Sequence, residues 1–172
     1  MAVQSGNACR EEERASWYPR AMNLRLRTVS SRAEAGGLKA LLEQAVRAAG
    51  APGELPPADV ARRYLERTLG TREALVVVAE QREAERPLAL AASAPLADPL
   101  TQDTVAMLVL LYVDPSIRQR GVARELVREL RRALAERGIG TLWARAPHND
   151  DALISMGERW GFVRAWELLT SD

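Results

Sequence analysis

The segment Leu111–Ala123 carries the residue types and spacing that most clearly suggest a chemical role. An apolar stretch runs into the turn Asp114-Pro115, and a helical pattern starts directly after Gly121. The first turn of a helix has unpaired N–H groups and a partial positive charge, so it attracts an anion wherever its backbone is accessible. Gly121 removes the side chain at the point of closest approach. The segment therefore predicts a cradle for a phosphate or pyrophosphate.

Arginine side chains surround the same helix start. Arg118, Arg120 and Arg124 add full positive charges, and the planar fork of arginine matches phosphate oxygens. Seven arginines and three glutamates lie between Arg118 and Arg137, so this segment has a charge of +4. The whole chain has 24 Lys+Arg, 23 Asp+Glu and a net charge of +1. This balance disfavours a protein that binds nucleic acid through bulk basicity, and it predicts a small anion site on a balanced surface.

Two better-known phosphate motifs are missing from this stretch of sequence. The Gly-Lys-Ser/Thr of nucleotide hydrolases does not occur, and the three glycines of the dinucleotide fingerprint do not occur either. A solvated, arginine-rich helix start would also explain Gly121 together with one arginine. The full context of strand, Asp-Pro turn, arginine loop and helix favours the anion site.

The elements that must position this segment follow from the hydrophobic periodicity. An apolar run such as 105–113 is typical of a central strand that is covered on both faces. The alternation of strands and helices predicts one α/β (α+β) domain with a mixed central β-sheet and helices on both faces. We expect residues 22–172 to form the domain and residues 1–21 to be an N-terminal extension. The expected strands are 24–29, 74–80, 87–93, 105–113, 141–146 and 162–169, and the expected helices are 31–49, 57–70, 122–137 and 150–160.

The same segment resembles the hallmark of the GNAT (Gcn5-related) N-acetyltransferases. In that family a strand ending in Leu-x-Val-x-Pro is followed by Arg/Gln-x-x-Gly-x-Gly/Ala. A looser match is 158–162, where relatives often have Tyr-Glu-Lys-Leu-Gly-Phe. The resemblance implies a single GNAT-like domain with splayed central strands that form an acyl-CoA cleft, with acetyl-CoA as cosubstrate and no metal. The matching residues are Leu111, Val113, Pro115, Arg118, Gly121 and Ala123.

The resemblance also implies which groups hold the coenzyme. The N–H groups of the loop hold the pyrophosphate, and the strand before it pairs its backbone with the pantetheine arm, as an added strand would. An N–H near Leu111 stabilises the oxyanion. Asn149 touches the cofactor arm, although capping the helix at Asp150 is an equal alternative. The expected cofactor-binding residues are Leu111, Tyr112, Val113, Arg118, Gln119, Arg120, Gly121, Val122, Ala123, Arg124 and Asn149.

The implied reaction is direct transfer of the acetyl group from acetyl-CoA to a primary amine. It needs a base for the ammonium and an acid for the thiolate. Relatives place a tyrosine acid at the position that is Gly157 here, so water or Tyr64 would protonate the thiolate, or it would leave unassisted. A covalent route through Cys9 is disfavoured, because Cys9 lies in the extension.

The glutamate that some relatives use as the general base is also missing from this sequence. Some relatives carry a glutamate on the central strand where this chain has Met107. The candidates are His148, whose intrinsic pKa suits a base, and Glu80 or Asp103 near strand ends. His148 could instead be an exposed loop histidine, and Glu80 a surface residue at the end of a hairpin.

Several functions compete at this stage. The leading expectation is an N-acetyltransferase whose acceptor is a small-molecule amine or a protein N-terminus. The alternative is a non-catalytic acyl-CoA-binding sensor or regulatory module, which the missing tyrosine and glutamate keep open. Acetylation of charged transfer RNA is disfavoured, because no basic tract extends beyond the cofactor helix. The sequence stops soon after its last expected strand, so we expect a second subunit, in a homodimer, to complete the acceptor wall.

Cysteine content and hydropathy bear on the compartment. Cys9 is the only cysteine, so no intramolecular disulfide forms, as is typical of a reducing compartment. The N-terminal residues lack the basic-then-apolar pattern of a signal peptide. The longest apolar run, 105–113, is about half of the roughly 20 residues that span a bilayer. We expect a cytoplasmic protein that does not enter membranes.

Overall fold

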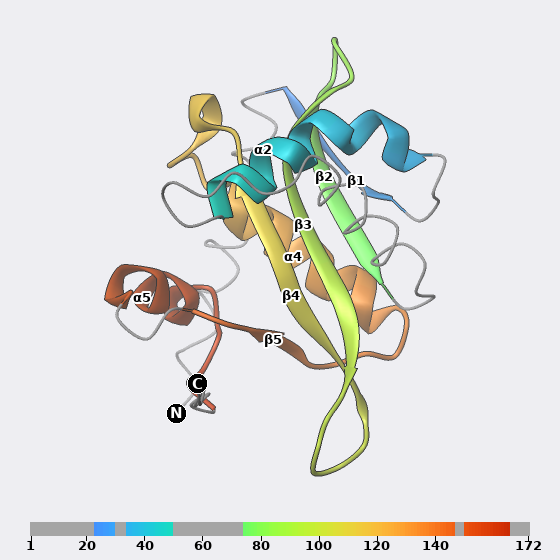
Figure 1. The fold of residues 1–172 in the computed structure, drawn as a ribbon, viewed down its shortest axis with the longest axis vertical. Helices are drawn as coiled ribbons and strands as arrows, with labels where there is room; N and C mark the ends of the chain where they lie inside the picture. The colour runs from blue at the N-terminus through green and yellow to red at the C-terminus, as the bar shows by residue number, and fades with distance from the viewer. Residues whose placement is uncertain (1–22, 30–33, 50–73, 147–149, 166–172) are drawn as a thin grey trace, which may run out of the picture.

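A five-stranded sheet organises the part of the chain that the computed structural model describes, residues 23–29, 34–49, 74–146 and 150–165. The strands follow one another in chain order across the sheet, and neighbours are antiparallel except for the last pair, which is parallel. Figure 1 shows the sheet face on. The strands are β1 (Leu24–Val29), β2 (Leu75–Gln81), β3 (Arg86–Ala97), β4 (Thr104–Val113) and β5 (Leu142–Ala144).

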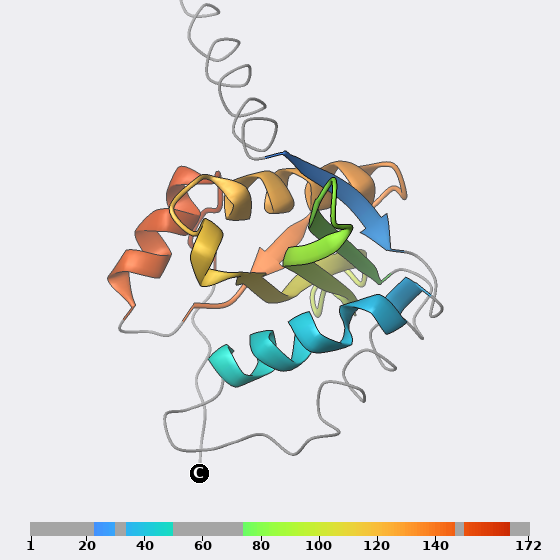
Figure 2. The ribbon, with the colours of Figure 1, turned by 90° about the horizontal axis from the view of Figure 1, so that it is seen from above.

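Helices cover both faces of this sheet. The α2 helix lies on one face and the α4 helix on the other, as the view from above shows (Figure 2). The parallel β4–β5 pair needs a crossover connection, and α4 supplies it. The helical elements are the 3₁₀ turn η1 (Glu34–Leu38), α2 (Lys39–Ala49), the 3₁₀ turn η2 (Pro115–Ile117), α4 (Val122–Ala135) and α5 (Asp151–Arg159).

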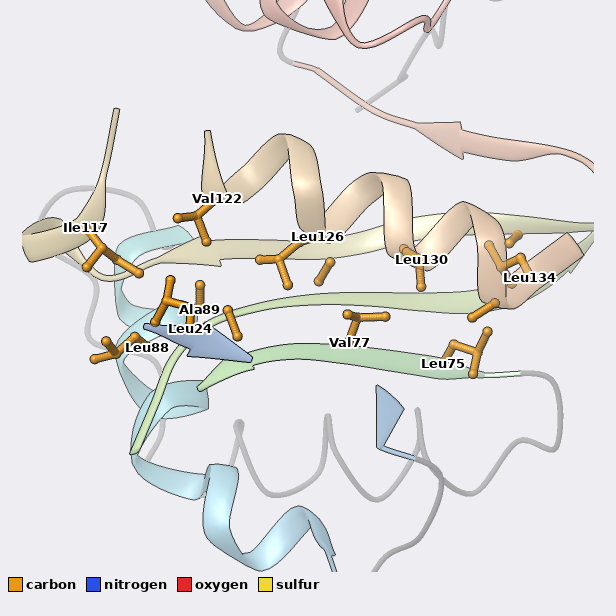
Figure 3. Packing of buried hydrophobic residues seen from close by; sticks show 14 of the residues in the cluster. Leu24, Leu75, Val77, Leu88, Ala89, Ile117, Val122, Leu126, Leu130 and Leu134 are labelled. Atoms are coloured by element: carbon orange, nitrogen blue, oxygen red, sulfur yellow. The ribbon is translucent and has the colours of Figure 1, made fainter. Parts of the chain in front are cut away.

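Alternating side chains of the strands divide the core into two layers. On β2, Leu75 and Val77 face α4, whereas Val76 and Val78 face α2. The α4 layer is held by one stripe of the helix with a spacing of four residues, which is the spacing that stacks side chains on one helix face. Figure 3 shows this stripe against the sheet. Its members are Val122, Leu126, Leu130 and Leu134, none more than 2% exposed.

The expected strands between residues 24 and 146 are all present; β1 has the expected bounds, and the other four have shifted ends. β3 runs on to Ala97 because it keeps pairing with β4 after its pairing with β2 has stopped at Ser93. The expected helix 31–49 divides into η1 and α2, and the Gly36-Gly37 pair explains the break, since glycine disfavours helix. Residues 162–165 are not in a strand. The expected extension 1–21, the helix 57–70 and the remainder of the last expected strand lie outside the described residues.

The α4 stripe gives a direct test of which contacts stabilise the domain. Leu130 is 0% exposed, whereas Leu100, in the turn between β3 and β4, is 73% exposed. Leu130→Ala should lower the free energy of unfolding by about 2–5 kcal/mol, because it leaves a cavity between α4 and the sheet. Leu100→Ala removes the same atoms from solvent and should change it by less than about 0.5 kcal/mol. Urea unfolding of both variants measures the difference, and equal losses would contradict the packing of α4.

Candidate functional site

Strand β4 departs from regular pairing at Val109. On the β3 side, Leu110 pairs with Ala92 and Leu108 with Ser93, so Val109 is an extra residue and forms a bulge. A bulge bends a strand and increases its twist. On the other side, the pairing of β4 with β5 ends at Leu108. Among the described residues, the half of β4 from Val109 to Val113 therefore pairs on its β3 side only.

The main-chain groups of Leu111 and Val113 face this open side. The Asp114 N–H donates to the Leu88 carbonyl oxygen at 2.8 Å, so Asp114 faces β3. Backbone groups alternate sides along a strand, which turns Tyr112 toward β3 as well and Leu111 and Val113 away from it. Unpaired peptide groups of this kind can hydrogen bond an extended ligand. Tyr112 is different, because its main chain faces β3 and its side chain is buried in the α2 layer.

The turn after β4 is fixed by its own hydrogen bonds and by the core. The Asp114 carboxylate accepts from Ser116 N at 2.9 Å and from Ser116 Oγ at 2.6 Å, and these bonds lower the pKa of Asp114. Ile117 is buried in the α4 layer. The Arg118 Nε donates to the Val113 carbonyl oxygen at 2.9 Å, which ties the loop back to the end of β4.

The start of α4 is left without a cap. Gly121 occupies the N-cap position with φ 75° and ψ 1°, a left-handed conformation that favours glycine, and it offers no capping side chain. The first bond of the helix runs from Glu125 N to the Gly121 oxygen, so three N–H groups before Glu125 have no intrahelical acceptor. Gln119, with φ 61°, and Arg120 are exposed beside them. The helix start therefore presents donors and positive charge to a ligand. The three N–H groups without an intrahelical acceptor are those of Val122, Ala123 and Arg124.

A buried carboxyl lies one turn into the same helix. Glu125 is 2% exposed, its Oε2 accepts from Arg128 Nη2 at 2.5 Å, and its Oε1 has no hydrogen-bond partner among the described residues. Burial raises the pKa of Glu125, although Arg128 and Arg124 oppose the shift. The neighbouring carboxyl behaves oppositely, because its hydrogen bond with Arg132 lowers the pKa of Glu129. In the sequence, Glu125 is one of the three glutamates between Arg118 and Arg137, and nothing in its spacing marks it as buried.

These opposite shifts give opposite pH dependences. With a folded-state pKa above its ordinary 4.5, Glu125 takes up a proton on folding, so its effect on stability becomes less favourable as the pH rises through that window. Glu125→Gln should therefore gain stability relative to the parent chain as the pH rises. Glu129, with its lowered pKa, stabilises the fold above its ordinary pKa, so Glu129→Gln should lose stability at neutral pH. Urea unfolding from about pH 3 to 8 covers both windows, because the effect of Glu129 is lost only as the pH falls below its ordinary pKa of 4.5, and two shifts of the same sign would contradict the assignment.

Glu80, a candidate base, forms a buried ion-pair cluster. Its carboxylate is 3% exposed and accepts from Arg27 Nε at 2.6 Å and Arg25 Nη2 at 3.1 Å, and Arg27 also contacts Glu34 at 3.0 Å. The register puts Glu80 four residues, about 13 Å, along β2 from the row of the bulge and about 10 Å across two strand spacings. This placement favours a structural role, joining β1, β2 and η1, over contact with a group at the bulge.

Of the remaining candidate residues from the sequence, the structure describes only Asp103. His148, Asn149, Tyr64 and Cys9 lie outside the described residues. The helix α5 is capped by Asp150, whose Oδ1 accepts from Leu153 N at 2.8 Å, so a different residue fills the capping role considered for Asn149. Asp103 is exposed in the turn between β3 and β4.

Sequence reasoning missed how α4 is tied to the end of α5. The Arg131 Nη1 donates to the Trp160 carbonyl oxygen at 2.7 Å, and the Arg131 guanidinium lies 4.3 Å from the Phe162 ring centre. Gly161 turns the chain between them with φ 83°. The matched Gly-Phe pair therefore packs against the helix that carries the cradle. The signal available in the sequence was the place of Arg131 beside the apolar stripe of α4.

The described residues contain neither a candidate membrane-spanning helix nor a candidate metal-binding cluster of side chains. No helix among them is long and apolar enough to cross a membrane. No group of three or more His, Cys, Asp or Glu side chains among residues 23–29, 34–49, 74–146 and 150–165 is arranged to hold a metal ion.

A bulged strand, a diverging neighbour and an uncapped helix start together define a domain that can bind an elongated ligand with an anionic end. The sequence profile of the acetyltransferase (GNAT) family matches residues 38–162. The chain belongs to this family. A search among curated protein sequences gives no significant match.

Solved structures support the fold. The aminoglycoside N-acetyltransferase AAC(6′)-Iy, in complex with a coenzyme A bisubstrate analogue, superposes with a TM-score of 0.69 at 18% identity, covering 87% of this chain and 97% of that chain. AAC(6′)-Ih from Acinetobacter baumannii gives 0.66 at 16% identity, covering 87% and 97%. A probable acetyltransferase gives 0.69 at 20% identity, covering 86% and 99%. At these identities the likeness concerns the fold.

Proposed function

We propose that this protein is an acetyl-CoA-dependent N-acetyltransferase that transfers the acetyl group directly to a primary amine. The observation that carries the proposal is the continuity of two sets of main-chain groups that have no hydrogen-bond partner among the described residues. Leu111 offers its N–H and C=O groups and Val113 its N–H group along β4, since the Val113 carbonyl accepts from Arg118, and the uncapped N–H groups of α4 follow directly after the turn. A pantetheine arm is an extended chain with amide groups, and a pyrophosphate suits a helix start.

The chemistry requires positioning more than covalent participation by the protein. The amine nitrogen attacks the thioester carbonyl carbon, the carbon–sulfur bond breaks, and the thiolate takes up a proton while the amine loses one. Main-chain N–H groups beside the bulge stabilise the charge that develops on the carbonyl oxygen. The turn at Asp114 and the buried Ile117 keep the cradle and the strand in fixed relation. Fixing both reactants contributes much of such an acceleration.

We propose a small molecule with a primary amine as the acceptor. The support is that several structural neighbours at low identity are aminoglycoside acetyltransferases, one of them solved with sisomicin. The second candidate is an acyl-CoA-binding sensor without turnover, and one observation favours it. Gly157 and Met107 stand where relatives carry an acid and a base, and neither side chain exchanges protons. Release of free thiol from acetyl-CoA with a panel of amines separates the two: amine-dependent release supports the enzyme, whereas coenzyme binding without release supports the sensor.

The cradle is tested by two substitutions of similar size at one position. Gly121→Asp and Gly121→Asn both add a side chain at φ 75°, a conformation that Asn and Asp tolerate, but only Asp adds a negative charge. Asp should weaken acetyl-CoA binding at least about tenfold more than Asn, because its charge repels the pyrophosphate. Calorimetric titration measures the affinities, and circular dichroism checks that both variants fold. Equal affinities in the two variants would place the pyrophosphate elsewhere.

The general base is tested by comparing two of the candidate residues, His148 and Glu80. We propose His148 as the base, since its unperturbed pKa suits proton removal near neutral pH. His148→Gln should lower kcat about 10²-fold or more and remove a pH limb near about 6.5. Glu80→Gln should lower stability, by weakening the bonds to Arg25 and Arg27, and keep most of kcat. A pH–rate profile for each variant decides, and a loss of kcat confined to Glu80→Gln would reverse the assignment.

A further inference from the structure

Three apolar side chains beside the divergence of β4 and β5 belong to neither layer of the core that the described residues form. Met107 is half-buried and pairs with the half-buried Trp143 of β5, and Val109, the bulge residue, is 36% exposed. We call these three residues the β4–β5 patch. Their apolar neighbours belong to the two layers, Leu108, Leu111 and Leu142 to the α4 layer and Leu110 and Tyr112 to the α2 layer.

The alternation of side chains along the strands places Met107 and Trp143 on the α2 side of the sheet. Ala106 and Leu108, the chain neighbours of Met107, pack in the α4 layer, and so does Leu142, the neighbour of Trp143. Successive side chains of a strand point to opposite faces, so the paired Met107 and Trp143 lie side by side on the face away from α4.

The patch adjoins the position at which the proposed transfer takes place. A ligand paired with the open side of β4 lies in the plane of the sheet, beside the point where β5 leaves β4 (Figure 1). Leu108 and Leu111 fill the α4 side at that point, which leaves the α2 side for the acceptor. Met107 is two residues before Val109, about 7 Å along the strand, and this distance is within the length of one small molecule.

The elements around the patch carry almost no negative charge. Arg86 is the only charged residue of β3, and β4 and β5 have none. The helix α2, which lies over β3 and β4, has one acidic side chain, Glu43, against Lys39 and Arg47. A polycation needs several carboxylates around it, whereas an indole face stacks on an apolar ring and attracts a single ammonium group. The surroundings therefore favour an acceptor with one amine on an apolar body.

We propose that the β4–β5 patch binds the acceptor, and that the acceptor is a primary amine carried on an aromatic body. This substrate class rests on the proposed function and narrows it. The ring of the acceptor stacks on Trp143 and contacts the polarizable thioether of Met107, and its amine nitrogen reaches the thioester next to the bulge. Trp143 is then a residue that determines acceptor specificity.

The first test compares acceptors with the full chain, by the release of free thiol from acetyl-CoA. The kcat/KM for 2-phenylethylamine should be at least about tenfold above that for n-propylamine, which carries the same amine without a ring. It should exceed the values for the polycations spermidine and sisomicin by at least as much. A value for any of these three that equals or exceeds that for 2-phenylethylamine overturns the aromatic acceptor and leaves the proposed function intact.

The substitution Trp143→Leu keeps an apolar side chain and removes the flat ring. It should lower kcat/KM for 2-phenylethylamine about tenfold, through KM, and change that for n-propylamine by less than about twofold. A general structural defect would lower both values alike. The matched control is Trp160→Leu, because Trp160 is half-buried at the end of α5, where its carbonyl accepts from Arg131 of α4. The control should keep the parent ratio, and an unchanged ratio in Trp143→Leu overturns the assignment.

The substitution Met107→Glu adds a carboxylate beside Trp143. It should raise kcat/KM for spermidine relative to 2-phenylethylamine about tenfold, because the new charge attracts the polycation and is desolvated by the ring. The ratio is the readout, since a new general base at this position would raise both values alike. An unchanged ratio places the acceptor elsewhere.

A binding measurement decides the case in which no amine releases thiol. That result overturns the proposed function, and 2-phenylethylamine is then titrated calorimetrically into protein saturated with coenzyme A. Binding that Trp143→Leu weakens about tenfold keeps the patch as a site for an aromatic amine. Absence of binding, or equal binding by the parent protein and Trp143→Leu, overturns it.

Discussion

The divergence of β5 from β4 is the constraint on which the site depends. The two strands share three paired positions, ending at Leu108, and the bulge at Val109 bends β4 at that point. A buried peptide group without a hydrogen-bond partner costs about 1–3 kcal/mol. The peptide groups beyond the bulge must therefore hydrogen bond to water or to a ligand. The fold completes the sheet on the β3 side of β4 and, among the residues that the structure describes, leaves donors and acceptors without partners on the other side.

The helix α4 joins stability and binding in one element. Its stripe from Val122 to Leu134 fills the layer over β2 and β3, which fixes the helix start relative to the end of β4. Leaving Gly121 uncapped and burying Glu125 both run against the stability of that first turn. An uncapped start leaves these N–H groups available to water or to an external anion. The packing of the rest of the helix offsets the local cost.

Local patterns in the sequence predicted the helices and strands. The bulge and the ion pairs of Glu80 depend instead on how strands far apart in the chain align. The α4 stripe and the alternation on β1 are periodic, so both were predictable, and Gly121 marked the start of α4, where the anion cradle is proposed. The bulge has no signature in Val109 itself, because it arises from how β3 and β4 align. Glu80 was assigned from its place at a strand end, whereas its partners Arg25 and Arg27 lie more than 50 residues away in the chain.

The bond between Arg118 and Val113 sets where strand-like pairing can end. On the open side of β4, the Val113 carbonyl accepts from the Arg118 side chain, and both groups of Leu111 and the N–H of Val113 have no partner among the described residues. An extended ligand along β4 therefore finds its last free acceptor at Leu111. Beyond that point, donors alone continue, through the Val113 N–H to the N–H groups at the α4 start. A ligand that fits this order of donors and acceptors carries amide groups at one end and negatively charged acceptor oxygens at the other. The order of its parts is therefore specified by main-chain geometry rather than by side chains.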